Sequence, residues 1–426
     1  MAFLADKLKK ILEQNLNEGR GHAGYRGQLR EMFGISEDDN GTPILKRADR
    51  VLDPANLDAR EIALTFLGRG YGASDVRRAF ALSEQYGQFS EAEGAVVMPS
   101  HFAKISAFSD TVAGLVDALT MEAYTSPEFI GDSLFEVKAA RVNGGKMIGV
   151  MNDGGAGDDL TDGEPYPTVG LKETYVDIPD NQRRGNVIQV NEKVFLYDRT
   201  DQLEAACKTA GNSVARLKEL KQAKCAMGVT NTYARDGISA NTFQDGTEGT
   251  GVPNNYTNSA VNELTNYANI DAAFQTLEGN TDPGTGFEIT VPTPQIAVMP
   301  QMQMNLRSAL EAEWIRKLSD TGNTVTQTPD PLIRPVTPVI LTRIWYNLLV
   351  AAGVSAANAK ARWWFGEFKK ALQYRQIIPF GVAPAPLSSE DARRDIVGVW
   401  VAREHGVPFV KEPRFLYMGT KEDITP

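Results

Sequence analysis

The chain has 426 residues, 42% hydrophobic and 23% charged, so it is long enough for two or three packed units or one elaborated fold. This near-average composition argues against a disordered chain. The net charge of −10 argues against a protein whose main task is to grip nucleic acid, because such proteins cluster Lys and Arg to neutralise phosphates.

Membrane insertion and disulfide bonding are both disfavoured. No run of about 18 uncharged apolar residues occurs, and charges interrupt residues 1–16, so neither a membrane span nor a signal peptide is expected. Cys207 and Cys225 are the only cysteines, and on one predicted helix they lie roughly 27 Å apart. They therefore cannot pair with each other, and a Cys-rich zinc site is excluded.

The N-terminal part of the chain is predicted to be helical. Residues 2–17 form an amphipathic pattern, and further helices are expected over residues 59–67 and 74–86, the last with Ser74 as its N-cap. Packing or partner contact explains the first helix better than a membrane surface, because it lacks a broad basic face. Its apolar stripe includes Phe3, Leu8, Ile11 and Leu12.

Strands and turns dominate the next part of the chain, after a helix predicted to end at about residue 123. Residues 152–168 are dense in Gly, Asp and Pro and predict a projecting loop. The turn-rich residues 179–185 predict a hairpin connection between the two strands that flank them. The strand runs are 135–145, 146–151, 171–178 and 186–197, with Val176, Ile178, Ile188 and Val190 predicted to point inward.

The longest predicted helix covers about residues 201–227 and ends at Gly228. Its length of about 40 Å could span a flat domain. A buried strand is expected at residues 295–300, and a helix over residues 301–318. The predicted inward stripe of the long helix is Leu203, Cys207, Ala210, Val214 and Leu217.

No motif in the sequence predicts a catalytic or metal site. His22, His101 and His405 are isolated from one another. Residues 154–162 resemble one calcium-binding nonapeptide turn, but such turns bind through stacked neighbours and only one copy occurs. A carboxylate-based cytosolic hydrolase remains an alternative, because a catalytic pair could be hidden among the 54 acidic residues.

An ordered series of segments carries a resemblance to a known family. It begins with GAVVMPSHFAKIS at residues 94–106 and continues through the paired strand runs and the long helix. It ends with WWFGEFKKALQYR at residues 363–375 and the strand run over residues 388–418. In these segments the chain resembles the major capsid proteins of tailed bacteriophages and prophages, which share the Hong Kong 97 type capsid fold.

The resemblance implies an α+β fold with an N-terminal arm, an extended β-hairpin loop, a peripheral domain with a long spine helix, and an axial domain. The expected segments are a helical N-terminal appendage (1–93), the arm and start of the peripheral domain (94–143), the extended loop (144–198), the spine helix (199–228), the axial domain with a polar insertion (229–385), and the returning peripheral strands (386–426).

The function implied by the resemblance is self-assembly into an icosahedral shell around a phage genome, without catalysis, cofactor or metal. The implied partners are copies of the chain in pentamers and hexamers, a portal protein, any scaffold, protease or decoration protein, and packaged double-stranded DNA bound without sequence specificity. We expect synthesis in the host cytoplasm and a final place in the virion capsid, with no membrane contact. An encapsulin-type nanocompartment shell shares the fold and remains an alternative.

Ten residues are candidate contacts between subunits. Some members of the resembling family crosslink subunits through a loop lysine and an asparagine, so Lys146 and Lys172 are the lysines of interest here. The ten candidates are Phe3, Leu8, Ile11, Leu12, Lys146, Glu164, Tyr166, Lys172, Arg183 and Arg184.

Overall fold

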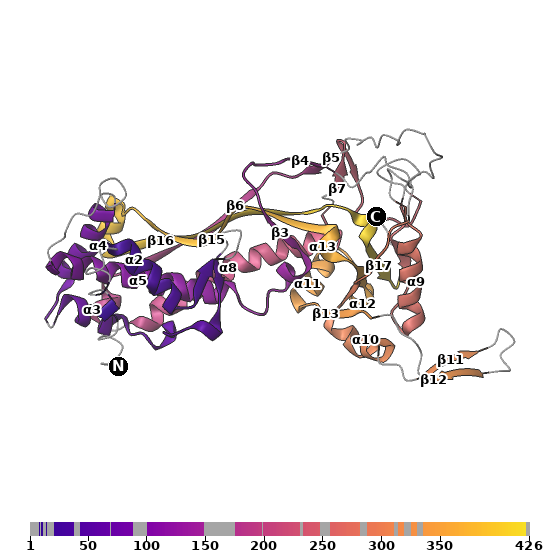
Figure 1. Ribbon diagram of the computed structural model, residues 1–426, viewed down its shortest axis with the longest axis horizontal. Helices are drawn as coiled ribbons and strands as arrows, with labels where there is room; N and C mark the ends of the chain where they lie inside the picture. The colour runs from indigo at the N-terminus through magenta and orange to yellow at the C-terminus, as the bar shows by residue number, and fades with distance from the viewer. Residues whose placement is uncertain are drawn as a thin grey trace, which may run out of the picture. The chain divides into compact units, whose positions relative to one another are not determined.

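The computed structural model shows mixed helices and sheets (Figure 1). The predicted α+β class is confirmed. The residues that the structure describes are 8, 10, 11, 14, 21–37, 43–68, 70–87, 100–148, 175–197, 199–230, 233–247, 256–281, 288–310, 314–318, 325–329 and 335–422.

Two compact units make up the chain. Unit 1 comprises residues 1–127, 183–217 and 378–405, and unit 2 comprises residues 128–182, 218–377 and 406–426. The six segments expected from the resemblance remain a prediction. The helices are α2 Gly21–Met32, α3 Ala59–Leu67, α4 Ala73–Gly87, α5 Ser100–Tyr124, α6 Gly131–Leu134, α7 Lys193–Leu196, α8 Thr200–Ala226, α9 Tyr267–Glu278, α10 Gln303–Leu310, α11 Arg343–Ala351, α12 Ala356–Ala361, α13 Phe368–Ala371 and α14 Ser389–Arg393.

Within the described residues, the strands form five sheets. Their orders are β1-β2, β13-β10-β14-β17-β9, β11-β12, β3-β15-β16-β6 and β4-β5-β7-β8. The strands are β1 Ile35–Glu37, β2 Pro43–Leu45, β3 Glu136–Ala139, β4 Gly145–Ile148, β5 Tyr175–Ile178, β6 Gln182–Asn191, β7 Tyr233–Arg235, β8 Ile238–Ala240, β9 Ser259–Val261, β10 Gln295–Val298, β11 Trp314–Leu318, β12 Val325–Pro329, β13 Thr337–Ile340, β14 Trp363–Gly366, β15 Leu372–Ala385, β16 Ile396–Val410 and β17 Leu416–Thr420.

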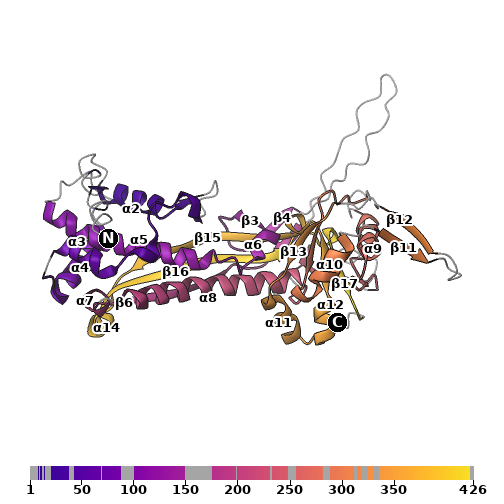
Figure 2. The ribbon, with the colours of Figure 1, turned by 90° about the horizontal axis from the view of Figure 1, so that it is seen from below.

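Helices α2, α3 and α4 all pack against α5 in unit 1 (Figures 1 and 2). Helix α3 has the predicted bounds: the Asp58 carboxylate accepts a hydrogen bond from Arg60 N at its start, and Gly68, at φ +91°, follows its last residue. The N-cap prediction for α4 is wrong, because the helix already begins at Ala73 and Ser74 lies in its first turn. Asp75 Oδ2 instead accepts from Gly72 N at this helix start.

Aromatic side chains fill the core of unit 1. The ring of Phe108 on α5 meets Phe80 edge-on at 5.6 Å and Phe195 edge-on at 5.3 Å. Trp400 on β16 meets Phe80 at 6.0 Å. These rings join α4, α5, α7 and β16, which are far apart in sequence, around one buried cluster.

Helix α8 confirms the predicted long helix. Four of its five predicted inward residues are buried, but Leu217 is 41% exposed, so that part of the prediction is wrong. Leu217 lies two heptads beyond Leu203, and an α-helix drifts by about 20° per heptad relative to a strict seven-residue repeat. The drift turns Leu217 to the edge of the buried stripe.

The predicted hairpin between β5 and β6 is wrong. Strand β5 is paired on both edges, with β4 and with β7, while β6 pairs with β16 in another sheet. Most of the expected turn, from Gln182 onward, lies within β6 itself. The four predicted inward residues are nevertheless all buried, two in each of these sheets.

Two expected elements end earlier than predicted. Residues 193–196 form α7 instead of continuing a strand, because Asn191 Oδ1 accepts a hydrogen bond from Lys193 N and stops the extended chain. The helix predicted over residues 301–318 ends at Leu310, and Trp314–Leu318 forms strand β11 paired with β12. Trp and Ile at the start of that segment favour a strand.

Candidate assembly surfaces

Half of the ten candidate contact residues lie outside the residues that the structure describes. Those five are Phe3, Leu12, Glu164, Tyr166 and Lys172. The single calcium-like turn predicted at residues 154–162 also lies outside them. Their roles therefore stay predictions.

Leu8 and Ile11 belong to the core of their own unit. The Leu8 side chain is 1% exposed and joins the apolar cluster around Phe80 and Trp400, against which Ile11 packs. This burial gives Leu8 a role in stabilising unit 1. A contact of either residue with another subunit stays a prediction.

Arg183 and Arg184 point to opposite faces of β6, as neighbouring residues of a strand do. Arg184 is fully buried, with its Nη1 3.9 Å from Oε2 of the buried Glu404 on β16. Arg183 is exposed on the other face. Lys146 is also exposed, on β4, with its amine 5.6 Å from the ring centre of Tyr175.

The exposed face of β6 and β16 in unit 1 carries positive charge. Gly185 lies beside Arg403, since a Cβ atom at Gly185 would be 3.2 Å from the Arg403 Cβ. The pKa of His405 is lowered by its partial burial and further by the charges of Arg183 and Arg403. We call this surface the arginine face; it comprises Arg183, Gly185, Val187, Val401, Arg403 and His405.

The opposite face of the same two strands is covered by helices. Ala402 on β16 and Phe380 on β15 form a buried cluster with Met121 of α5 and Val214 of α8. The ring of Phe380 stacks on Tyr124 at 3.9 Å. The arginine face is therefore the solvent side of a strand layer whose inner side is packed.

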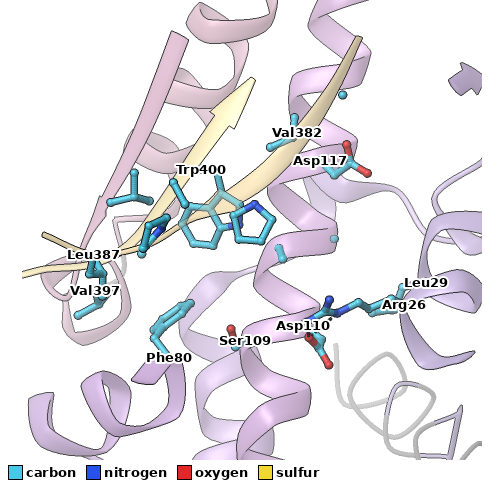
Figure 3. Close-up of a pocket in the computed structure, with 18 of the residues that line it drawn as sticks. Arg26, Leu29, Phe80, Ser109, Asp110, Asp117, Val382, Leu387, Val397 and Trp400 are labelled. Atoms are coloured by element: carbon cyan, nitrogen blue, oxygen red, sulfur yellow. Dashed lines mark hydrogen bonds and ion pairs between the residues drawn. The ribbon is translucent and has the colours of Figure 1, made fainter. Parts of the chain in front are cut away.

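A groove of about 550 Å³ lies within unit 1, between α2, α4, α5 and the adjoining parts of β15 and β16 (Figure 3). Phe80, Trp400 and Val382 give it an apolar floor, and the Trp400 Nε1 is buried without a hydrogen-bond acceptor among the described residues. Its volume lies in the range of small-molecule sites, but its walls form part of the unit's core.

Two arginines of α2 bind two aspartates of α5 beside this groove. Arg26 reaches Asp110 at 2.6 Å, and Arg30 Nε lies 3.3 Å from Asp117 Oδ2. Burial raises the pKa of Asp117 to about 6, and the attraction of Arg30 only partly opposes this. These ion pairs hold α2 against α5. Because its pKa is about 6, the Asp117 carboxyl changes its protonation state near pH 6.

The second part of α8, in unit 2, buries a carboxylate. Glu219 is 1% exposed; its Oε1 accepts from Trp345 Nε1 at 2.6 Å and its Oε2 accepts from Gly131 N at 2.7 Å. Burial raises the pKa of Glu219, while these donors lower it. Glu219 thus ties α8 to α11 and α6.

A second polar group adjoins it on the same helix. Lys218 Nζ lies 2.8 Å from Asp132 Oδ2 and 4.6 Å from the ring centre of Tyr374. Gln222 Nε2 donates to Asp132 Oδ1 at 2.7 Å. Sequence reasoning missed this cluster. One signal for it was present in the sequence: the residues that continue the inward stripe of α8 beyond Val214 at helical spacing are polar.

Another buried ion pair lies near the C-terminal strand of unit 2. Arg414 Nη1 binds Glu412 Oε1 at 2.7 Å, and its guanidinium lies 4.8 Å from the ring centre of Tyr256. Arg235 Nη1 lies 3.6 Å from Glu412 Oε2. All of these residues are buried, which indicates that they hold the fold together rather than form an accessible site.

Among the described residues, no group of three His, Cys, Asp or Glu side chains could hold a metal ion. Within the same part of the chain, no helix combines the length and apolar character that crossing a bilayer requires. The chemistry that the described residues do support is ion pairing, hydrogen bonding and apolar packing.

Comparison with known proteins gives a family match. A model of a family described as phage capsid protein matches residues 180–419, which is more than half of the chain. No curated protein matches.

Several solved structures are similar over most of their length. A virus-like particle from Pyrococcus furiosus is 8% identical, with 71% of this chain and 97% of that chain covered and a TM-score of 0.32. A satellite phage P4 procapsid that includes size determination (Sid) protein is 11% identical, with 72% and 98% covered and a TM-score of 0.36. The mature capsid of bacteriophage PhiM1 is 14% identical, with 69% and 87% covered and a TM-score of 0.38. The family match over residues 180–419 is the stronger finding.

Proposed function

The chain belongs to the phage capsid protein family, and on this premise we propose that it is the major capsid protein, the subunit that tiles an icosahedral shell around a phage genome. The family match over residues 180–419 carries the proposal, because it spans elements of both units, from β6 to β17. Its role is structural and needs no catalytic step of its own.

The energetics of the chain fit such a role. Buried hydrogen bonds and ion pairs hold the second part of α8 and the C-terminal strand within unit 2, while apolar side chains such as Val187 and Met304 remain 58% and 75% exposed. Exposed apolar surface that is buried on assembly stabilises contacts by roughly 25 cal/mol per Å². Head-to-tail contacts of one chain close into rings, and rings of five and six tile a shell.

The partners follow from the same proposal. Copies of the chain form pentamers and hexamers, a portal protein occupies one vertex, and a scaffold, protease or decoration protein acts where the phage has one. Packaged double-stranded DNA lies inside without sequence-specific contacts, and the net charge of −10 limits its adhesion to the wall. The protein is made in the host cytoplasm and ends in the virion.

Sedimentation and electron microscopy of the purified protein test the proposal. We expect capsomers or closed shells of megadalton mass. A stable monomer over a wide range of salt and pH would contradict it, and so would a small oligomer with hydrolase activity.

Deleting residues 152–168 tests the extended loop separately. The last part of the expected loop, β6 and α7, packs in unit 1. We propose that the chain between β4 and β5 reaches a neighbouring subunit, so the deletion should leave a folded subunit with weakened assembly. An acidic substitution at Leu8 cannot test whether the N-terminal appendage takes part in assembly. Leu8 is part of the core of unit 1, so the substitution would unfold the subunit before it could weaken a contact between subunits.

A further inference from the structure

The turn that joins β3 to β4 in unit 2 contains an Asn-Gly dipeptide. Asn143 is exposed, and Gly144 and Gly145 follow it at φ +61° and +107°, a backbone conformation that suits glycine. Because Gly144 carries no side chain, nothing keeps its backbone nitrogen away from the asparagine amide. This turn is therefore a candidate for a chemical change of the chain itself.

The side-chain amide of Asn143 is held by its oxygen. Its Oδ1 accepts hydrogen bonds from the backbone N of Asn181 at 2.8 Å and from the Asn181 Nδ2 at 3.2 Å. Donors on a carbonyl oxygen stabilise the negative charge that develops there when a nucleophile adds to the carbon. No group among the described residues binds the Nδ2 of Asn143, so this nitrogen is free to leave.

A carboxylate lies beside the glycine of the same dipeptide. Oδ1 of Asp180 is 2.8 Å from the position that a Cβ atom would take on Gly144. The pairing of Gly145 with Ile178 holds the end of β5, and with it Asp180, at this turn. Asp180 forms no ion pair with any cation that the structure describes, so its carboxylate is available to accept a proton.

We propose that Asn143 modifies itself by attack of the Gly144 backbone nitrogen on the carbon of its side-chain amide. A bond forms between this nitrogen and Cγ, and the proton of the nitrogen passes to the Asp180 carboxylate. The bond from Cγ to Nδ2 then breaks, and Nδ2 leaves as ammonia with that proton. Water opens the resulting succinimide ring at either carbonyl and gives aspartate or isoaspartate at position 143.

The reaction changes the charge and the backbone of this turn. The product places a second carboxylate near Asp180, and like charges repel. Isoaspartate also lengthens the backbone by one atom just before Gly145, where the pairing of β4 with β5 begins. The end of this strand pair should therefore loosen as the protein ages. The inference goes beyond the proposed capsid function and does not depend on it, because the reaction takes place within one subunit.

Mass spectrometry of aged protein tests the proposal. Trypsin cuts after Arg141 and Lys146, so Asn143 is the only asparagine of the peptide VNGGK. The folded, full-length protein is incubated for several weeks at a series of pH values, and the peptide is measured for the gain of one mass unit. An isoaspartyl methyltransferase labels the isoaspartate product. Asn181, in the peptide ETYVDIPDNQR, is the internal control because Gln182 follows it.

We expect modification at Asn143 to be at least tenfold faster than at Asn181. Asp180→Asn should slow the reaction at least tenfold and make its rate rise in proportion to hydroxide, since the solvent must then take the proton. Asp180→Glu, which keeps a carboxylate, should react faster than Asp180→Asn. Glu128→Gln makes the same change in charge at an exposed position of unit 2 and should leave the rate unchanged.

Two results would overturn the inference. If the peptide VNGGK stays unmodified in the folded protein but is modified in urea, the fold protects Asn143. If Asp180→Asn reacts at the wild-type rate with the same pH dependence, the carboxylate takes no part in the reaction. Neither result depends on whether the chain forms shells, so this experiment is separate from the test of the proposed function.

Discussion

Helix α8 is one continuous helix whose two parts are held by different kinds of contact. Residues 200–217, in unit 1, present small and apolar side chains, and Gly211 packs so closely on α5 that an added Cβ would clash with the Thr120 carbonyl oxygen. Residues 218–226, in unit 2, include the buried Lys218, Glu219 and Gln222, each of which has a polar partner.

The difference predicts two kinds of sensitivity. Apolar contacts are non-directional, so the first part of α8 should respond to changes in volume. Buried polar contacts are directional and costly when broken, so the second part should respond to the loss of a single acceptor. Variants in each part of the helix test this difference.

The largest effect is expected at Glu219. Replacement by Ala removes the acceptor of Trp345 Nε1 and Gly131 N and leaves both donors buried, which should lower the free energy of unfolding by roughly 3–5 kcal/mol. Urea denaturation of the dissociated subunit measures the change. Glu204→Ala is the control on the same helix, because its pair with Lys208 is close to solvent and should contribute less than about 0.5 kcal/mol. Equal losses at both positions would remove the distinction.

The next effect is expected at Gly211 in the first part of α8. With Ala there, the added Cβ would lie 2.9 Å from the Ala123 Cβ and closer still to a backbone carbonyl, so α5 and α8 must separate. We expect a loss of about 2–3 kcal/mol. Gly27 on α2 has open space around it, and Gly27→Ala should raise stability by about 0.4–1 kcal/mol. Thermal unfolding of both variants should therefore shift in opposite directions.

The periodic features of the chain could be predicted from its sequence. The bounds of α3 and α8 and the burial of Cys207 follow from local spacing and end signals, which a short window contains. The pairing of β5 with β7 could not be predicted in this way. It sets Val176 opposite Arg235, and no local signal specifies so distant a partner.

The buried polar cluster was harder to predict for the same reason. Glu219 lies 126 residues from Trp345 and 88 residues from Gly131, so its sequence neighbourhood resembles an ordinary charged helix. Arg184 gave a misleading signal, because it is next to the exposed Arg183 yet fully buried against Glu404. The two arginines differ in burial because neighbouring residues of β6 point to opposite faces of the strand.

Acidity provides a smaller test, within unit 1. The pKa of Asp117 is raised to about 6, against about 3.9 in an unfolded chain, so the folded subunit binds the proton more tightly. The stability from this proton is fully present below about pH 4 and is lost as the pH rises through about 6.

Asp117→Asn should therefore reduce this pH dependence. The difference in unfolding free energy between wild type and variant should change by roughly 2 kcal/mol between pH 4 and pH 7. Arg30→Gln removes the cation that opposes the shift and should move the transition to higher pH. A constant difference across this range would contradict the raised pKa of the buried carboxyl.

The smallest effect is expected at Leu217, the last residue of α8 in unit 1. Its side chain is 41% exposed, so Leu217→Gln should change the stability of the dissociated subunit by less than about 0.5 kcal/mol. Val214, one turn earlier, is 2% exposed among Met121, Phe380 and Ala402, and Val214→Ala should cost roughly 1–3 kcal/mol. A large loss of unfolding free energy for Leu217→Gln in the isolated subunit would show that the first part of α8 responds to side-chain volume even at its exposed edge. If Leu217→Gln leaves the subunit unchanged but raises the concentration needed for assembly, the exposed edge of the stripe is a contact between copies, and the comparison extends from the fold of one subunit to the shell.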